Sequence, residues 1–406
     1  MRNSEHRILT THVGSLPRPD DLIELNRAFA AGESRDESAR EARTASAVTE
    51  VVRLQRDAGI DVPNDGEFGK ATEHRINFGA WWSYIYPRWG GLRAGGDMMR
   101  AEPRRSSPGH VVLTSFSDRR DRQMFASAYA DPESGVSTAP KGGGGMVLPV
   151  CVGPISYTGH AMIAADIAHL KAALDAAGVD EGFMTSIAPG SCGRIPNQYY
   201  KSEEDLMFAC AEAMRVEYQA IIDAGFVLQL DDPALATSWD MINPEPSVAD
   251  YRAFAALRVE ALNHALRGLP ADRVRYHLCW GSWHGPHVTD IPMRHLIDIV
   301  LQVNAGAISF EAGNVRHEHE WKVWRDVKLP DGKLLIPGVV SHATNVVEHP
   351  DLVADRLVRF AGLVGRNNVL AGTDCGLGGR VHPDIAWAKL RALAQGAARA
   401  SERLWR

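Results

Sequence analysis

The sequence lacks several features that define large classes of protein. It contains no uninterrupted run of about eighteen apolar residues, so it predicts no membrane-spanning helix and no membrane partner. Residues 1–6 have no apolar core of the kind found in secretion signals, which makes a cytoplasmic location the expectation. No basic run is present and the formal net charge is -6, which argues against nucleic acid as a partner.

Two further absences bear on redox state and fold. The 406 residues include only five cysteines, at positions 151, 192, 210, 279 and 375. An odd, small number in a chain without a secretion signal indicates free thiols and metal ligands rather than a disulfide framework. No GxGxxG turn follows an early strand, so an open, doubly wound nucleotide-binding sheet is disfavoured.

What the sequence does have is an alternation of strand-like and helix-like segments, in a composition (45% hydrophobic, 23% charged) typical of globular enzymes. The predicted strands are 8–15, 60–62, 147–155, 183–188, 226–230, 274–279, 307–311, 334–340 and 369–375. The predicted helices are 19–31, 41–58, 161–177, 202–224, 248–267, 291–303, 350–364 and 383–403, with Ser202 as a helix cap. This alternation predicts the α/β class, specifically a (β/α)8 TIM barrel. Nine strands exceed the eight of a closed barrel, so 147–155 is expected outside it.

One segment does not follow the barrel rhythm. Residues 71–145 are rich in aromatics near their start and end in Lys141 followed by four glycines. We expect a single catalytic domain, 1–406, with 71–145 inserted as an excursion that packs over the barrel and a glycine hinge at its end. A lid or a dimer contact is the other interpretation, so a homo-oligomer is left open.

Polar residues gather where the predicted strands end. They are Ser15, Glu67, Asp231, His277, Cys279, Glu311, His342, Asp374 and Cys375. Parallel strands in a barrel end on one face, and catalytic residues of such barrels lie there. The distribution therefore predicts an active site on the C-terminal face of the barrel.

His277 and Cys279 are two residues apart on one predicted strand, so their side chains point to the same side. Zn²⁺ binds imidazole nitrogen and thiolate together, and Glu311 and Cys375 end two later strands as further ligands. A single strand cysteine is more often a core residue, and a structural zinc knuckle is a second alternative. The knuckle usually has close Cys-x2-Cys pairs, which this set lacks.

A zinc site with two thiolates and a carboxylate is too electron-rich to generate hydroxide well. It suits a different task, which is to bind a substrate thiol and keep it as a thiolate at neutral pH. Glu311 is then the exchangeable ligand that the thiol displaces.

These residues resemble the cobalamin-independent methionine synthase family, in its C-terminal catalytic barrel, from Val13-Gly14-Ser15 to Asp374-Cys375-Gly376. The segments similar to His277-Leu278-Cys279, Phe310-Glu311 and Cys375 supply the zinc ligands of that family. The resemblance implies a TIM barrel and a zinc-dependent transfer of a methyl group to a thiol such as homocysteine, from a donor such as methyl-tetrahydrofolate.

The resemblance also implies residue roles. Glu67 and Asp231 match acids that bind the amine of homocysteine, and Ser15 lies in the turn that holds its carboxylate. His342 matches a histidine that donates a proton during the transfer. These four assignments are carried by the family likeness and not by spacing.

Other segments differ from the long enzymes of the family. Their N-terminal duplicate barrel is absent from these residues, and their folate-stacking tryptophan segment is not recognisable. Segments 281–287 and 314–321 are more similar to a short-chain branch that includes enzymes opening epoxides with the thiol of coenzyme M. For that acceptor, Arg194, Arg316 and Arg380 are candidate partners of the sulfonate.

Three functions therefore stand: thiol methyl transfer, epoxide opening by a zinc-bound thiol, and a zinc-binding barrel without catalysis. The histidines at 284, 287, 317 and 319 form a group of their own. A second metal is one interpretation of them, and orientation of metal ligands or lining of the substrate mouth is the other.

Overall fold

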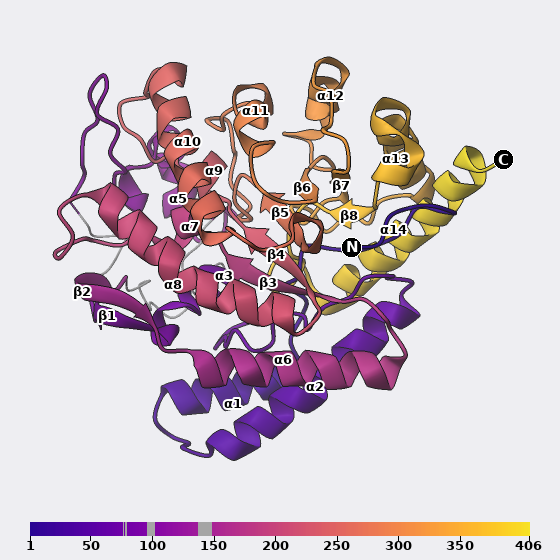
Figure 1. The fold of residues 1–406 in the computed structure, drawn as a ribbon, viewed down its shortest axis with the longest axis horizontal. Coiled ribbons are helices and arrows are strands. Elements are labelled where there is room, and N and C mark those ends of the chain that lie inside the picture. Colours follow the sequence, from indigo (N-terminus) through magenta and orange to yellow (C-terminus); the bar gives the residue numbers. More distant parts are fainter. Residues whose placement is uncertain (76, 78, 96–101, 137–147) are drawn as a thin grey trace.

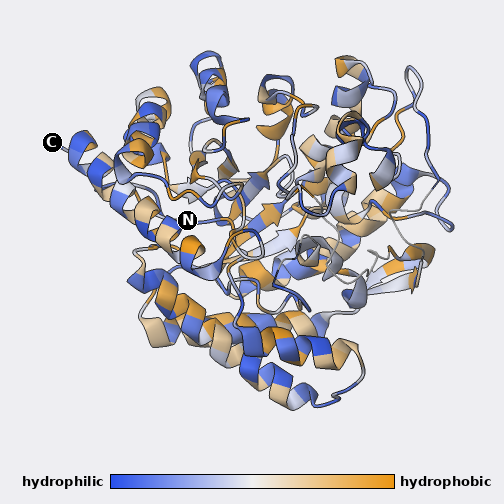
Figure 2. Ribbon diagram, turned by 180° about the vertical axis from the view of Figure 1, so that it is seen from behind, coloured by the Kyte–Doolittle hydropathy of each residue, from blue (hydrophilic) through white to orange (hydrophobic). Residues whose placement is uncertain are grey.

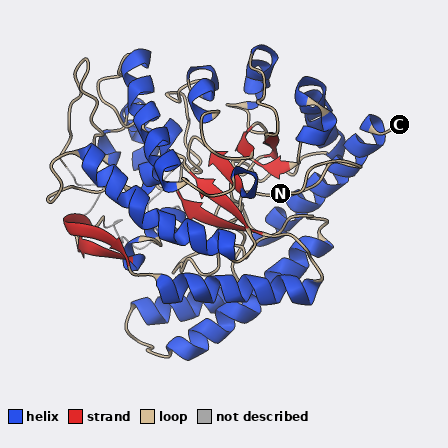
Figure 3. Cartoon of the chain, viewed as in Figure 1, coloured by secondary structure: helices blue, strands red, loops and turns tan. Residues whose placement is uncertain are grey.

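The computed structural model describes residues 1–75, 77, 79–95, 102–136 and 148–406. Six parallel strands form the central sheet, in the order β3-β4-β5-β6-β7-β8, and helices surround it (Figures 1 and 3). The strands are β3 Phe183–Ile187, β4 Val227–Asp231, β5 Val274–Leu278, β6 Ala307–Glu311, β7 Leu334–Val340 and β8 Gly372–Thr373. Each strand lies beside the next in sequence, as a series of βα units requires.

Two extended segments close this sheet into a ring. Segment 9–11 exchanges two backbone hydrogen bonds of 2.8 Å with Ala371, just before β8. On its other side, the amides of residues 61 and 62 donate to the carbonyl of residue 10 at 3.1 Å. The carbonyl of Pro63 then accepts from the amide of Phe183, the first residue of β3, at 3.0 Å. The predicted TIM-barrel fold is confirmed, although these two positions of the ring are not regular strands.

Among the described residues, seven long helices cover the outside of the barrel. They are α1 Asp20–Ala30, α2 Glu37–Asp57, α6 His160–Ala177, α8 Glu203–Asp223, α10 Val248–Ala265, α13 Pro350–Val364 and α14 Pro383–Leu404. Ser202 caps α8 as predicted, accepting from the amide of Asp205 at 3.0 Å. Helix α2 starts before the predicted residue 41 because the carboxylate of Asp36 caps it, accepting from the amide of Ala39 at 2.9 Å.

The predicted helix 291–303 is wrong. The segment forms only the 3₁₀ turn η5, Met293–His295, and the single-turn α11, Ile297–Val300. Leu296 separates them with φ at -120°, outside the helical range, and its side chain is fully buried. Burial of this leucine therefore overrides the helical spacing.

The barrel strands alternate strictly between two environments. One set of alternating positions is polar and includes Thr185, Gln229, Arg275 and His277. Inside the barrel, Arg275 donates to Gln229, and His277 lies within hydrogen-bond distance of Ser309. The residues between them on β4, β5 and β6 are apolar and join the main core: Leu228, Leu230, Tyr276, Leu278, Ile308 and Phe310. Hydrophobic and hydrophilic residues are interspersed along the long helices (Figure 2), and each of these helices buries part of its surface, as α14 does at Leu390 and Leu393. The main core thus lies between sheet and helices, while the barrel interior combines these polar groups with two smaller apolar clusters, which include Phe183, Val227 and Ile336.

The ninth predicted strand lies outside the barrel. Strand β2, Val150–Tyr157, pairs antiparallel with β1, Trp89–Arg93, and the two lie at the side of the barrel (Figure 3). The inserted segment also contains α3 Ala80–Ser83, η1 Tyr86–Arg88, η3 Phe116–Asp118, α4 Arg120–Met124 and α5 Ala126–Ala130. The predicted glycine hinge, 141–145, lies outside the described residues. A single domain, and a lid or dimer role for 71–145, stay predictions.

The remaining elements are short connections. They are α7 Pro189–Cys192, α9 Ala234–Thr237, η4 Ala271–Arg273, η6 Glu318–Lys322, α12 Val323–Asp326 and η7 Arg366–Asn368. In the described part of the chain, no helix has the length and apolar character needed to cross a membrane.

Candidate active site

Three predicted metal ligands meet at the C-terminal ends of β5 and β8. The ligand atoms of His277, Cys279 and Cys375 all lie within 4.8 Å of one another. His277 lies on β5, Cys279 directly follows the end of that strand, and Cys375 follows β8 after Asp374. The sheet closes so that residues almost a hundred positions apart face the same point.

The chemistry of this group fits a thiophilic cation. His277 is 2% exposed; its Nδ1 lies 3.3 Å from Ser309 Oγ, and its Nε2 has no hydrogen-bond partner among the described residues. Both cysteines are free thiols. Their mutual hydrogen bond holds the pKa of Cys375 well below its ordinary value and raises that of Cys279. An unpartnered imidazole nitrogen beside two thiols, one of them easily ionised, is the donor set that Zn²⁺ prefers.

Glu311, the fourth predicted ligand, belongs to an adjoining group. Its carboxylate lies with His342 and Asp374, ligand atoms again within 4.8 Å of one another. The amide of Trp280 donates to Glu311 Oε1 at 2.8 Å, and Asn314 Nδ2 donates to Oε2 at 2.5 Å. Burial, together with the charges of Asp374 and Cys375, raises the pKa of Glu311 well above its ordinary value. The two groups are neighbours, because Glu311 also contributes to the raised pKa of Cys279.

Asn314 and Asp374 hold this second group in place. Asn314 Nδ2 also donates to Asp374 Oδ2 at 3.1 Å, so one amide bridges two carboxylates. Asp374 Oδ1 accepts from the amides of Ala312 and Gly313, both at 2.8 Å. The backbone after β6 is therefore tied to the residue that precedes Cys375, which fixes Glu311 relative to the thiols.

His342 follows β7 and is 1% exposed. Neither of its ring nitrogens has a hydrogen-bond partner among the described residues. Burial lowers its pKa to about 3, so the ring is neutral at physiological pH. A buried, neutral imidazole beside two carboxylates and a thiol has unused hydrogen-bonding capacity for a substrate.

The predicted substrate acid Glu67 lies in a strained turn at the other side of the barrel mouth. Gly66 has φ 66° and Glu67 itself has φ 64°, a conformation that side chains other than glycine rarely adopt. Thr185 Oγ1 donates to Glu67 Oε1 at 2.6 Å, and Lys70 Nζ donates to the same oxygen at 2.8 Å. The acid is thus already paired with a cation from its own loop.

Ser15 and Asp231 complete the predicted substrate residues. Gly14, with φ 130°, lets the chain pass so close to Thr185 that a Cβ there would lie 2.6 Å from Thr185 Cγ2. Ser15 O accepts from the amides of Leu377 and Gly378 at 3.0 and 2.9 Å, which places Ser15 beside the Cys375 loop. Asp231 Oδ1 accepts from Gln229 Nε2 at 2.7 Å, and burial raises its pKa to about 7.

Sequence reasoning missed the partners that organise these residues. Lys70 and Thr185 contact Glu67, and Asn314 contacts Glu311. Lys70 had a usable signal, since it follows Glu67 by three residues in a Gly-containing turn. Asn314 had the same signal, since it follows Glu311 by three residues. Thr185 had none, because its contact with Glu67 depends on how the barrel closes.

Two of the four grouped histidines, His287 and His317, belong to one hydrogen-bonded network. His317 Nδ1 and Nε2 lie 3.0 Å from Glu320 Oε2 and Asp290 Oδ2, and His287 Nδ1 lies 2.9 Å from the same Asp290 oxygen. Its two carboxylates raise the pKa of His317 to about 10 against the effect of burial. His317 stacks on Trp280, whose amide holds Glu311. Within the described residues, neither group with metal-ligand geometry includes these histidines.

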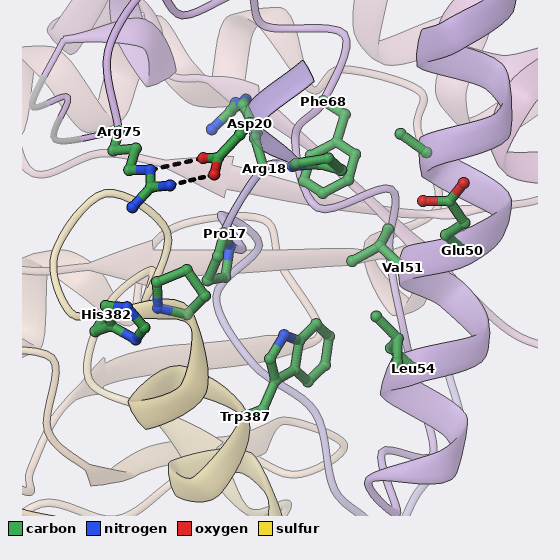
Figure 4. A pocket seen from close by; sticks show the side chains of 13 residues that line it. Pro17, Arg18, Asp20, Glu50, Val51, Leu54, Phe68, Arg75, His382 and Trp387 are labelled. Carbon is green, nitrogen blue, oxygen red and sulfur yellow. Dashed lines mark hydrogen bonds and ion pairs between the residues drawn. The ribbon is translucent and has the colours of Figure 1, made fainter. Parts of the chain in front are cut away.

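A cavity of about 360 Å³ opens nearby, between α1, α2 and α14 (Figure 4). Its lining includes Phe68, Trp387 and Arg18, with the ion pair of Arg75 and Asp20 at one side. None of the predicted site residues lines it. Arg18 separates the cavity from the Glu67 turn, since its guanidinium donates to the carbonyls of Glu67 and Lys70.

The chain resembles known proteins in both sequence and fold. Residues 148–399 match the sequence profile of the family described as "Cobalamin-independent synthase, Catalytic domain". A methionine synthase of Saccharolobus islandicus is 25% identical over 391 residues, 95% of this chain and 93% of the relative. One of Sulfurisphaera tokodaii is 24% identical over 392 residues, 95% of this chain and 90% of the relative.

Two solved structures share the fold over nearly the whole length. A B12-independent methionine synthase from Shewanella sp. W3-18-1, in complex with selenomethionine, superposes with a TM-score of 0.68 at 19% identity, covering 98% of this chain and 99% of that one. A putative vitamin-B12 independent methionine synthase from Listeria monocytogenes gives 0.61 at 18% identity with the same coverage.

Proposed function

Because the chain belongs to the cobalamin-independent synthase catalytic-domain family, we propose that it is a zinc-dependent methyltransferase with homocysteine as its thiol acceptor. The observation that carries the proposal is the unpartnered, buried Nε2 of His277 beside the thiols of Cys279 and Cys375. His277, Cys279 and Cys375 would hold Zn²⁺, and Glu311 would be the ligand that the acceptor thiol replaces. The curated relatives are named methionine synthases, which supports homocysteine as acceptor.

The bound cation would lower the pKa of the acceptor thiol and keep it ionised at neutral pH. The acceptor sulfur forms its bond to the methyl carbon while the bond from that carbon to the donor breaks. Where the donor leaves as an amine, as methyl-tetrahydrofolate would, its nitrogen takes up a proton. We assign the transfer of that proton to His342, whose neutral ring would accept the proton that the acceptor thiol releases and pass it to the nitrogen. We assign Asp231 to the ammonium of the acceptor and the turn at Ser15 to its carboxylate. Glu67 lies close to the same turn but is already paired with Lys70.

One observation keeps the epoxide-opening alternative in view. Arg380 Nε donates to Ser282 Oγ at 2.8 Å, three residues after Cys279. Burial lowers the pKa of Arg380 to about 10, against the opposing charges of Cys375, Glu67 and Cys279. The Arg380 guanidinium interacts electrostatically with both thiols and with Glu67. A guanidinium in this position can bind the sulfonate of an acceptor such as coenzyme M.

Metal analysis of the purified, fully reduced protein tests the proposal. We expect about one zinc per chain, lost in both Cys279→Ser and Cys375→Ser. Cys210→Ser is the matched control, because Cys210 is a buried free thiol in α8. Titration with homocysteine and with coenzyme M, read by zinc X-ray absorption, then identifies the acceptor by the added zinc–sulfur bond. Wild type without zinc, or zinc that survives both substitutions, would contradict the assignment.

A further inference from the structure

Lys70 is a buried cation that the proposed reaction leaves without a role. Its side chain is only 7% exposed, and the side chain of Glu67 only 4%. Burying an ammonium is costly unless it is paired and hydrogen-bonded, so a lysine in this position needs a specific set of partners.

The structure supplies that set in full. Lys70 Nζ donates to Glu67 Oε1 at 2.8 Å and to Thr185 Oγ1 at 2.7 Å, and it lies 4.5 Å from the centre of the Tyr84 ring. Two hydrogen bonds and one aromatic face hold the ammonium in place. Tyr84 is itself fixed, since its hydroxyl donates to Glu217 Oε1 at 2.7 Å.

The backbone of Lys70 is equally constrained. Its amide donates to Glu67 O at 3.0 Å, and its carbonyl accepts from Arg18 Nη2 at 2.9 Å. Gly69 packs so closely on Asp166 that a Cβ there would lie 2.1 Å from Asp166 Oδ1. The turn therefore presents the lysine to Glu67 in one geometry, and a swing away from it would break several contacts.

This arrangement changes what Glu67 can recognise. An acid that binds the ammonium of an amino acid must offer uncompensated negative charge, but here an internal ammonium already neutralises Glu67. The cation also acts on the other acids of the site. Burial raises the pKa of Asp65 and of Asp231, and the positive charge of Lys70 partly lowers both pKa values again. Arg18 adds a second positive charge beside Glu67 and Asp65. Lys70 and Arg18 thus offset much of the negative charge of the acids at this end of the site.

We propose that Lys70 is a specificity-determining residue of the acceptor site, which takes the position at Glu67 that an acceptor ammonium would otherwise occupy. Small thiols with an anionic end then bind whether or not they carry an ammonium. This inference rests on the proposed thiol-transfer function and narrows its substrate class to thiol carboxylates or sulfonates.

The test compares homocysteine with 4-mercaptobutyrate, which has the same chain and carboxylate but no ammonium. Both are titrated calorimetrically into zinc-loaded and zinc-stripped protein. We expect the dissociation constants of the two thiols for wild type to agree within about threefold. The ammonium of homocysteine adds little binding free energy, because Lys70 already neutralises Glu67. In Lys70→Met, Glu67 is released to pair with the ligand, and the preference for homocysteine rises about tenfold.

Three variants separate this effect from general damage. Lys70→Arg keeps the cation and should keep the wild-type ratio. Lys333→Met removes a lysine at the opposite end of the barrel, where Nζ bonds to the carbonyls of Val303 and Ala305, and should also keep the ratio. If Lys70 is the partner of Glu67, Glu67→Gln should weaken the binding of both thiols equally. If Glu67 binds the acceptor ammonium directly, the substitution should weaken the binding of homocysteine alone.

The outcomes distinguish the two proposals. If neither thiol binds in a zinc-dependent way, the proposed function fails and this inference fails with it. If both thiols bind through zinc but wild type prefers homocysteine by more than tenfold, or the ratio is unchanged in Lys70→Met, only the role of Lys70 is overturned. Should Lys70→Met not fold, the Glu67→Gln comparison decides alone.

Discussion

The acids of the 65–67 turn show how single residues are set up by their immediate surroundings. Glu67 has a positive φ, which costs on the order of 1 kcal/mol or more for a residue with a side chain. Its amide donates to Asp65 Oδ1 at 2.9 Å, so Asp65 stabilises the strained turn from within. Ionised Asp65 is itself unfavourable in the folded state, because its side chain is 7% exposed and lies near the charges of Asp166 and Glu67.

We expect Asp65→Asn to stabilise the protein in a pH-dependent way. Burial, reinforced by Asp166, raises the pKa of Asp65 to about 6 from an ordinary 3.8. Because the folded state holds this proton more tightly, the contribution of Asp65 to stability falls as pH rises from about 4 to 6 and stays low above that. Asparagine keeps the acceptor oxygen and cannot ionise. The free energy of unfolding should increase by about 3 kcal/mol at pH 7.5 and by about half of that at pH 5.

Urea unfolding of both proteins at the two pH values measures this difference. Asp331→Asn serves as the control, because Asp331 is exposed and its partner Lys328 is exposed too. An Asp65→Asn protein that gains as much stability at pH 5 as at pH 7.5 would show that the carboxyl does not titrate in this window.

At the scale of elements, one buried acid makes several of the contacts that attach the inserted segment to the barrel mouth. Asp240, in the loop after α9, accepts from Arg119 Nε at 2.6 Å, from the amide of Asp121 at 2.9 Å and from Thr289 Oγ1 at 2.7 Å. Arg119 lies 4.1 Å from the ring centre of Trp283, four residues after Cys279. The inserted segment thus contacts the loop that follows β5, the strand that carries His277.

We expect Asp240→Asn to loosen segment 102–136 while the barrel stays folded. The substitution keeps the shape but leaves the buried guanidinium of Arg119, 6% exposed, without its counter-ion. Removing one partner of a buried ion pair costs about 3 kcal/mol or more. Hydrogen exchange and limited proteolysis should both increase across 102–136, with little change in the strands.

Glu245→Gln is the matched control for this experiment. Glu245 pairs with Arg120, beside Arg119, but is 59% exposed, and such surface pairs contribute little. Equal effects of the two substitutions on proteolysis would show that the attachment does not depend on Asp240.

At the scale of the whole molecule, the sequence predicted the features that repeat with a regular period. The two-residue period predicted that His277 and Cys279 come together, as they do at the end of β5, and helical spacing together with a cap signal located α8 at Ser202. Strand ends gathered the polar residues because the topology of a barrel brings them to one face. These features depend on the local periodicity of strands and helices and on the topology of the barrel, which brings the ends of its strands to one face.

The features that sequence reasoning missed depend on closure of the ring. Residue 10 and residues 61–62 take strand positions with few regular hydrogen bonds, and burial of Leu296 interrupts the helix that its spacing predicts. The pairing of Lys70 with Glu67 requires a positive φ at Glu67 and a threonine from β3. Neither condition has a periodic signature, so the charge balance of the site could not be predicted from the sequence.

Closure itself depends on a residue inside the barrel. Arg275 on β5 donates from Nε to Gln229 Oε1 at 2.7 Å, from Nη1 to Thr11 Oγ1 at 2.9 Å and from Nη2 to His12 O at 2.6 Å. Its guanidinium also lies 3.4 Å from the ring centre of Phe183 on β3. One side chain thereby joins β3, β4 and β5 to the irregular segment that completes the ring.

We therefore expect Arg275→Met to destabilise the entire barrel rather than one loop. Methionine fills much of the space but leaves the acceptor groups of Gln229, Thr11 and His12 unpaired in the interior, a loss of about 3 to 5 kcal/mol. Arg273→Met, two residues earlier, is the control, because Arg273 is 27% exposed and lies where β5 begins. Urea unfolding followed by tryptophan fluorescence and by circular dichroism should show one coincident transition, shifted to lower urea only in Arg275→Met. Two separated transitions would mean that the first segment and the six-stranded sheet unfold independently, and that Arg275 does not couple them.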